Sequence, residues 1–290
     1  MQNLSRKPIV SGRFYPDNAQ ELGGVVKRFL EVKSGVVIPE KPSLMTIIPH
    51  AGYLFSGVVA GATLGTAHLE KNCILLGPNH TGRGEALSVW PGGEWLSPLG
   101  AVPVNSSLAK AIIDAKLGFV ADTEAHLGEH SLEVTLPFIQ EKLCIQDKGI
   151  CIPPHIVPIC VASVDFETLK KAGQGLGKLI KKYNAQHSSP VSLIVSSDMS
   201  HYVSAKEASR LDSLALNEVL SLDPKGLFDV VNREKISMCG VAPAVLGLFA
   251  ALELGASKAY KVAYTNSGET GSSFGATMDS VVGYAGIIVQ

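Results

Sequence analysis

Runs made almost entirely of apolar residues recur along the chain, and each has the length of a β-strand. The clearest runs, rich in isoleucine and valine, cover residues 44–48, 73–76, 156–161, 191–195 and 283–289. Strands exposed on one face alternate apolar and polar residues, whereas strands buried on both faces are apolar throughout. The pattern therefore predicts a sheet that is covered on both sides.

Helix start signals lie between the apolar runs. A capping residue, with Glu or Gln three residues later or Pro one residue later, precedes several amphipathic stretches. The predicted starts are at Asp17 with Gln20, Asp165, Ser204 with Glu207, and Asp223 with Pro224. The helix from Asp165 is expected to end near residue 183, and the apolar stretch 241–254 is expected to be a buried helix.

The alternation of strands and helices predicts an α/β fold. Helices between fully apolar strands indicate a three-layer α/β/α sandwich around a mostly parallel or mixed sheet. The chain of 290 residues shows neither an internal repeat nor a linker that would divide it. Residues 1–290 are therefore predicted to form a single domain, which is within the size range of α/β domains.

Three of the predicted strands run directly into polar turns. These turns contain His50, His80, and the pair Asp198 and His201, and Gly and Pro lie beside the first two histidines. Gly and Pro let the backbone turn sharply and hold a side chain outward. A single histidine after a strand is more often a capping or core residue than a ligand. Ligands of open α/β sheets collect at the carboxyl ends of strands, so three such turns favour a site where they lie side by side.

Cys239 comes just before the apolar stretch 241–254. The positive end of a helix dipole there is expected to lower the pKa of the thiol and favour the thiolate, which is both a nucleophile and a soft metal ligand. A small buried hydrophobic residue is the alternative interpretation. It is the one preferred for the other four cysteines, Cys73, Cys144, Cys151 and Cys160.

His130 stands between Glu129 and Glu133, ahead of an amphipathic stretch. A histidine between two carboxylates can be a proton shuttle or an oriented supporting group. A helix-end residue with solvent partners is an equally good interpretation. His126, close by, is expected to lie in a loop.

Charge and composition exclude several classes of protein. The chain has 25 Lys and Arg residues against 26 Asp and Glu, without a basic stripe, so nucleic acid is not expected as a partner. The longest apolar segment, 241–252, is too short to cross a bilayer, so no membrane association is expected. The mean hydropathy of +0.23 indicates a large core or a surface buried in a homo-oligomer.

The cysteines and the amino terminus favour a cytoplasmic location. Five cysteines, without a C-x-x-C pair, form neither a disulfide framework nor a zinc knuckle pattern. We therefore expect no disulfides, with Cys151 and Cys160 as the pair to check because both lie near the strand run 156–161. The first residues lack the apolar stretch of a signal peptide.

Several motifs, taken together and in order, resemble the Memo family, whose bacterial and archaeal members are called AmmeMemoRadiSam system protein B. The resemblance begins at SGRFYP and covers nearly the whole chain. It is carried by PHAGYLFSG, LLGPNHTG, EHSLEVTLPF, SSDMSHY, MCGVAPAVL and VVGYAG. It implies a fold similar to that of the class III extradiol dioxygenases of the LigB type, which use non-haem iron.

The resemblance also implies roles for particular residues. The two histidines and one cysteine that hold a metal in the family correspond to His50, His80 and Cys239. Asp198, His201 and His130 correspond to further polar residues that line the same cleft. In a metal-dependent reaction we expect His201 to act as acid or base, with Asp198 orienting it or supporting a ligand. True extradiol dioxygenases have a carboxylate where this chain has a thiol, a departure that weakens the case for cleavage of a catechol ring. Two imidazoles and a thiolate suit iron, copper or zinc.

Three functions follow from these residues. The first is a metal-binding, dioxygenase-like or redox protein with one metal ion, iron being the first candidate, acting on a small molecule or peptide in the cleft. The second is a metal-independent cysteine hydrolase, with Cys239 as nucleophile, His50 or His201 as base and Asp198 as orienter. The third is a module that binds a peptide or small ligand without catalysis.

Overall fold

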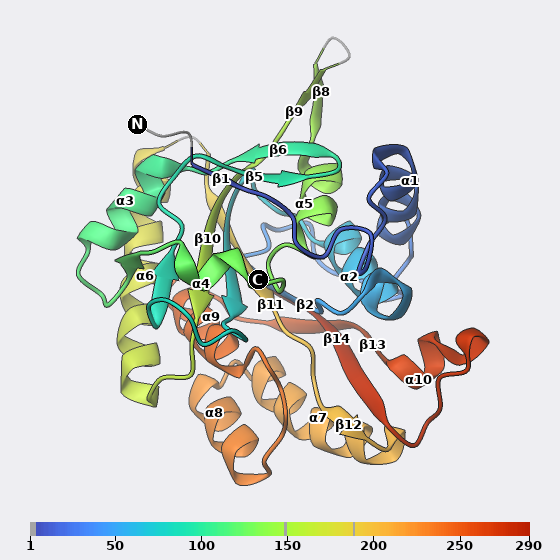
Figure 1. Ribbon diagram of the computed structural model, residues 1–290. Coiled ribbons are helices and arrows are strands. Elements are labelled where there is room, and N and C mark those ends of the chain that lie inside the picture. Colours follow the sequence, from blue (N-terminus) through green and yellow to red (C-terminus); the bar gives the residue numbers. More distant parts are fainter. Residues whose placement is uncertain (1–3, 148–149, 188) are drawn as a thin grey trace.

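The computed structural model describes residues 4–147, 150–187 and 189–290. Within these residues a mixed sheet of nine strands forms the centre of the molecule (Figure 1). Its middle consists of four parallel neighbours, in the order β2 (Met45–Ile48), β11 (Val191–Ser196), β3 (Asn72–Pro78) and β10 (His155–Val161). These strands coincide with four of the predicted apolar runs to within two residues.

The two edges of the sheet make it mixed. Next to β2, the antiparallel strand β14 (Val281–Val289) covers the fifth predicted run and also pairs with β12 (His201–Val203) and β13 (Ala259–Asn266). At the other edge, β4 (Leu87–Val89) is antiparallel to β10 and pairs with β7 (Val120–Ala121). The prediction of a mostly parallel or mixed sheet is confirmed.

Helices cover both faces of this sheet (Figure 1). Ile47 and Leu76 belong to the core on one face, and their strand neighbours Ile48 and Leu75 belong to the core on the other. The first core is closed by α3 (Ser106–Asp114), α6 (Phe166–Gln186), α7 (Ala205–Leu220), α8 (Pro224–Arg233) and α9 (Val241–Glu253). The second is closed by α1 (Ala19–Leu30), α2 (Tyr53–Thr66) and α5 (Leu136–Leu143). The fold is therefore the predicted three-layer sandwich.

Most helix starts are where the capping residues predict them. The side chains of Asp165, Ser204 and Asp223 accept hydrogen bonds from the first turns of α6, α7 and α8. At α1 the prediction is wrong by one residue, because Asn18 rather than Asp17 has the extended backbone that aims a side chain at the amides of residues 20 and 21. Helix α6 continues to Gln186, three residues beyond the predicted end.

Several short elements have no predicted counterpart. They include a small sheet of β1 (Ser5–Arg6), β5 (Glu94–Ser97) and β6 (Gly100–Pro103), and the short helices α4 (Glu124–Leu127) and α10 (Ser267–Thr270). A hairpin of β8 (Ile145–Asp147) and β9 (Ile150–Ile152) projects at the top of the view in Figure 1. These elements are too short to show a periodic apolar pattern.

The cysteines correct one expectation. Cys144 is disulfide-bonded, so the prediction of a chain without disulfides is wrong. Cys144 is only partly buried, because it caps the end of α5 at the root of the hairpin instead of lying in the core. Cys73, Cys160 and Cys239 are free, so the pair named for checking, Cys151 and Cys160, is not bonded. The side chain of Cys151 itself lies outside the described residues.

The membrane expectation can be compared with the helices directly. Across the described ranges, no helix is both long enough and apolar enough to cross a bilayer. The apolar helix α9, for example, has 13 residues, whereas a span needs about 20.

Candidate metal centre

The polar turns that follow three neighbouring central strands meet at the carboxyl ends of those strands. His50 follows β2, Asp198 follows β11 and His80 follows β3, and these strands are adjacent and parallel. The predicted side-by-side arrangement of the strand ends is confirmed. Cys239 reaches the same place from the loop before α9, and ligand atoms of His50, His80 and Cys239 all lie within 4.8 Å of one another.

His50 is held so that one ring nitrogen faces this cluster. Its Nδ1 lies 2.7 Å from Ser196 Oγ, and the Ser196 hydroxyl donates to the carbonyl oxygen of Ser131 at 2.8 Å. Since that hydroxyl has only one proton to give, Nδ1 must carry a proton and Nε2 a lone pair. The Nε2 atom faces Cys239 Sγ at 3.3 Å. Burial, followed by the charges of His130 and His80, holds the pKa of His50 well below its usual value, so the ring is neutral and able to bind a metal.

His80 is held by Glu129 in an equivalent way. The carboxylate of Glu129 accepts the His80 backbone N–H and lies 2.9 Å from Nδ1. Burial of Glu129 works to raise its pKa, but hydrogen bonds from His80 and Ser131 outweigh burial and lower the pKa to about 2. An ionised carboxylate only accepts hydrogen bonds, so Nδ1 of the neutral ring carries the proton and Nε2 is available. Histidines that bind metals in proteins are usually supported by a carboxylate or carbonyl in this manner.

Cys239 differs from expectation in its acidity. Burial, and then the negative charge of Asp198, raise the pKa of its thiol, so the predicted lowering by the helix dipole is wrong. Cys239 stands two residues before the first residue of α9, with Gly240 as the cap, and desolvation there is larger than the dipole effect. The backbone N–H of Asp198 donates to Sγ at 3.2 Å. The thiol therefore needs a nearby cation to become a thiolate at neutral pH.

Gly240 lets the Cys239 turn lie flat against the end of β11. Its N–H donates to Ser197 Oγ at 3.0 Å. A Cβ atom at this position would lie 2.3 Å from Ser197 Cβ and 2.6 Å from the carbonyl oxygen of Ser196, distances that atoms do not tolerate. The absence of a side chain thus sets how close the thiol comes to His50.

Asp198 and His201 are both at the site but are not arranged as a simple pair. Asp198 is buried and accepts the backbone N–H of His50 at 2.8 Å, so it supports the turn that carries a donor. Burial raises its pKa. His201 Nδ1 lies 2.9 Å from the carbonyl oxygen of Ser237, and its backbone N–H donates to the Ser237 hydroxyl. Ser237, rather than Asp198, therefore fixes the ring nitrogen of His201.

His130 packs among the donor histidines. Its ring is stacked on His80 at 5.1 Å and lies edge-on to His50 at 5.6 Å. Its Nδ1 is 3.5 Å from Glu129, so His80, Glu129 and His130 form a second group of converging ligand atoms that shares His80 with the first. On its other side, Phe14 packs edge-on against His130 at 5.1 Å.

Comparison with known proteins decides the family. A sequence model described as Memo-like protein matches residues 6–288. The chain belongs to the Memo-like family. It is 37% identical to a MEMO1 family protein of Aquifex aeolicus over 284 residues, which is 98% of each chain. It is also 37% identical to one of Methanosarcina mazei over 287 residues, 98% of this chain and 99% of the other.

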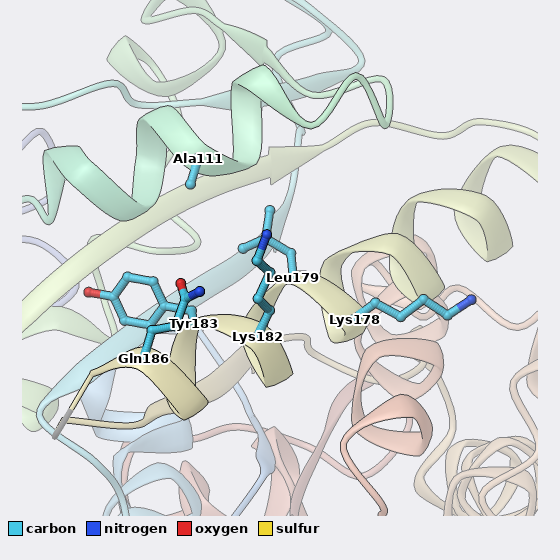
Figure 2. Close-up of a pocket in the computed structure, with 6 residues that line it drawn as sticks. All are labelled: Ala111, Lys178, Leu179, Lys182, Tyr183 and Gln186. Carbon is cyan, nitrogen blue, oxygen red and sulfur yellow. The ribbon is translucent and has the colours of Figure 1, made fainter.

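Two hollows of this Memo-like chain differ in whether a lining residue contacts the group of histidines at the candidate metal site. One, of about 430 Å³, is lined by residues 12–16 and by parts of α1 and α2, and includes Phe14, so it lies one side chain away from His130. The other is a groove of about 460 Å³ between α3 and α6 (Figure 2). It is lined by Ala111, Lys178, Leu179, Lys182, Tyr183 and Gln186. None of the candidate metal ligands lines this groove, so volume alone does not identify the site.

Two residues of the site in this Memo-like chain have no predicted role. Glu129 and Ser196 fix the tautomers of His80 and His50, and both are buried. Glu129 has a signal in the sequence, since it is a carboxylate directly beside His130. Ser196 has none, because a serine at the end of an apolar strand is common.

Proposed function

We propose that this Memo-like chain binds one metal ion through His50 Nε2, His80 Nε2 and Cys239 Sγ. The observation that carries the proposal is the convergence of these atoms within 4.8 Å. It is supported by the hydrogen bonds of Ser196 and Glu129, which place the proton of each neutral ring on Nδ1 and leave Nε2 as the donor atom. The hydrogen bond with Glu129 also raises the pKa of His80, so a metal would have to displace a proton from that ring. Neutral imidazole and thiolate are borderline and soft donors, so the set fits iron first in a dioxygenase-like site and copper or zinc as alternatives.

The proposed reaction class is oxidation or oxygenation of a small molecule or peptide. Three protein donors leave coordination positions open, so a bound metal would supply redox or Lewis-acid chemistry there. The hollow lined by Phe14 and Tyr53 is the proposed space for the ligand, and the Phe14 ring separates it from His130. The thiol in place of the carboxylate of extradiol dioxygenases argues for a different substrate from a catechol.

The remaining polar residues are proposed to serve this reaction without binding the metal. Asp198 keeps His50 in place through the backbone N–H of that residue. His201 is half-exposed and has Nδ1 held by Ser237, so Nε2 is the nitrogen that would accept or deliver a proton. His130 would exclude water from the donors and exchange protons with the ligand.

A cysteine hydrolase is the second candidate, and one contact favours it. Cys239 Sγ lies 3.3 Å from His50 Nε2, a distance suited to a thiol and its base. The raised pKa of Cys239 weighs against it, since a nucleophilic cysteine normally has a lowered pKa. A module that binds a ligand without catalysis would keep full binding after Cys239→Ser.

Metal analysis of the protein purified without added metal tests the proposal. We expect about one metal ion per chain, and its loss in His50→Ala and Cys239→Ser with unchanged circular dichroism. His201→Ala should keep the metal and lose activity. His187→Ala is a matched control, because His187 is exposed and contacts Tyr183 rather than the donors. Full metal content in Cys239→Ser would remove the thiolate from the ligand set and favour the hydrolase.

A further inference from the structure

A buried arginine near the amino terminus contacts the segment that supports His80. Arg6, on the short strand β1, is 1% exposed, and its guanidinium lies 4.3 Å above the ring of Trp95. It donates to the carbonyl oxygen of His126 at 2.9 Å and to that of Glu129. It also forms an ion pair of 2.8 Å with Glu133. One side chain therefore ties together three points within eight residues of the chain.

Glu133 completes this connection from the other side. Its carboxylate accepts the backbone N–H groups of Ile9 and Val10 and the hydroxyl of Tyr15, each at 2.9 Å. Every oxygen of Glu133 is thus used by the first fifteen residues. A buried ion pair with all its hydrogen bonds made allows few alternative geometries.

The connection ends at a proposed metal ligand. Arg6 binds the main chain of Glu129, and the carboxylate of the same residue binds the backbone and the ring of His80. We infer that Arg6 is a positioning residue for the metal centre: it fixes the main chain of Glu129, and thereby the tautomer and orientation of His80. Arg6 does not contact the donor atoms, and this inference rests on the proposed function for its effect on metal binding.

The geometry makes arginine the required residue. Its planar guanidinium presents several N–H groups in a fixed arrangement, which here serve the carbonyls of His126 and Glu129 and the carboxylate of Glu133, in addition to a longer contact with the carbonyl of Lys7. A lysine could pair with Glu133 but could not hold all three acceptors in place. Arg6→Lys therefore keeps the charge of the pair and releases the main chain of Glu129.

The decisive experiment reads the His80 ring in metal-free protein. Ring ¹⁵N signals of histidine-labelled protein are recorded above the pKa of His80, and His80 is assigned by its absence in His80→Gln. We expect the proton on Nδ1 in the wild type and a mixture of both tautomers in Arg6→Lys and Arg6→Met. Leu169→Ala, a buried change on α6 in the opposite core, is the control for loss of stability alone and should keep the wild-type signal.

Metal affinity is the second readout. Zinc binding, measured by competition with a chromophoric chelator, should weaken by about tenfold or more in Arg6→Lys, the usual effect of losing a group that supports a ligand. A His80 signal in Arg6→Lys identical to the wild type would overturn the inference. If the wild type fails to bind zinc, iron or copper, the proposed function fails instead, and the metal-free spectra still decide the role of Arg6. Arg6→Lys also serves if Arg6→Met does not fold.

Discussion

Two pairs of histidine and cysteine in this molecule have the same distance and different surroundings. Cys239 Sγ lies 3.3 Å from His50 Nε2, and Cys160 Sγ lies 3.3 Å from His126 Nδ1. In each pair the other ring nitrogen is held by an oxygen, Ser196 Oγ for His50 and the carbonyl of Ser88 for His126. By contact distance alone the two pairs are indistinguishable.

The pairs differ in what else reaches them. His126 is fully buried and lies edge-on to Trp90 and Trp95, both at 5.7 Å, so apolar rings close the space around it. His126 is also in α4 and not in the expected loop. The His50 pair instead faces His80, which supplies a third donor. A site therefore needs a third converging ligand and room beside it, and a histidine next to a cysteine is not enough.

The largest expected effect is on zinc affinity, which substitution of Cys239 should lower and substitution of Cys160 should not. Cys239→Ser should weaken zinc binding roughly a hundred- to a thousandfold, because structural zinc sites bind with about 10–16 kcal/mol, or about 2.5–4 kcal/mol for each of four ligands. Cys160→Ser should leave the affinity unchanged. Competition with a chromophoric chelator measures both. Equal losses in the two variants would mean that Cys239 affects the metal only through the fold.

The next effect concerns His126 and the pH dependence of the free energy of unfolding. Burial lowers the pKa of His126 to about 4 from its ordinary 6.5. As pH falls, His126 is therefore protonated in the unfolded chain before it is protonated in the folded protein. The contribution of neutral His126 to the free energy of unfolding is complete above pH 6.5 and is lost as pH drops towards 4. The loss is about 3 kcal/mol at 1.36 kcal/mol per pKa unit. Urea unfolding between pH 7 and 4 should show this loss in the wild type and in His187→Ala, and a shallower dependence in His126→Leu. The same dependence in His126→Leu would assign it to other groups.

The smallest effect concerns thiol reactivity. In metal-free protein at mildly alkaline pH, iodoacetamide should modify Cys239 at least about tenfold more slowly than in the unfolded chain, since each unit of raised pKa reduces the thiolate tenfold. Cys160 should not react until the protein unfolds. Mass spectrometry of peptides after timed labelling measures both. Rapid, selective modification of Cys239 would support the cysteine hydrolase.

Most of the sheet could be predicted from the sequence because its central strands are apolar at most positions. The runs at 44–48, 73–76 and 191–195 end beside His50, His80 and Asp198 in both prediction and structure. The short strands between Leu87 and Pro103 could not be predicted, since they gain their order from pairing rather than from a pattern of their own.

The site was predictable in its histidines and less so in its supports. The donors follow from strand ends and from the family resemblance, but the raised pKa of Cys239 depends on burial, which a helix-start pattern does not show. The role of Arg6 could not be predicted either, because Arg6 is 120 or more residues away in sequence from each of its partners His126, Glu129 and Glu133. Contacts of that separation exist only once the chain has folded.

Gly240 has a consequence for how this centre could change in evolution. A single methyl group there would meet Ser197 and Ser196 at 2.3 and 2.6 Å, whereas ordinary contacts are 3.4–4 Å. Relief would require a shift of the Cys239 turn several times larger than the roughly 0.2 Å by which metal–ligand distances vary. A descendant could therefore lose the proposed metal site while keeping all three candidate donors, by exchanging one hydrogen atom for a methyl group.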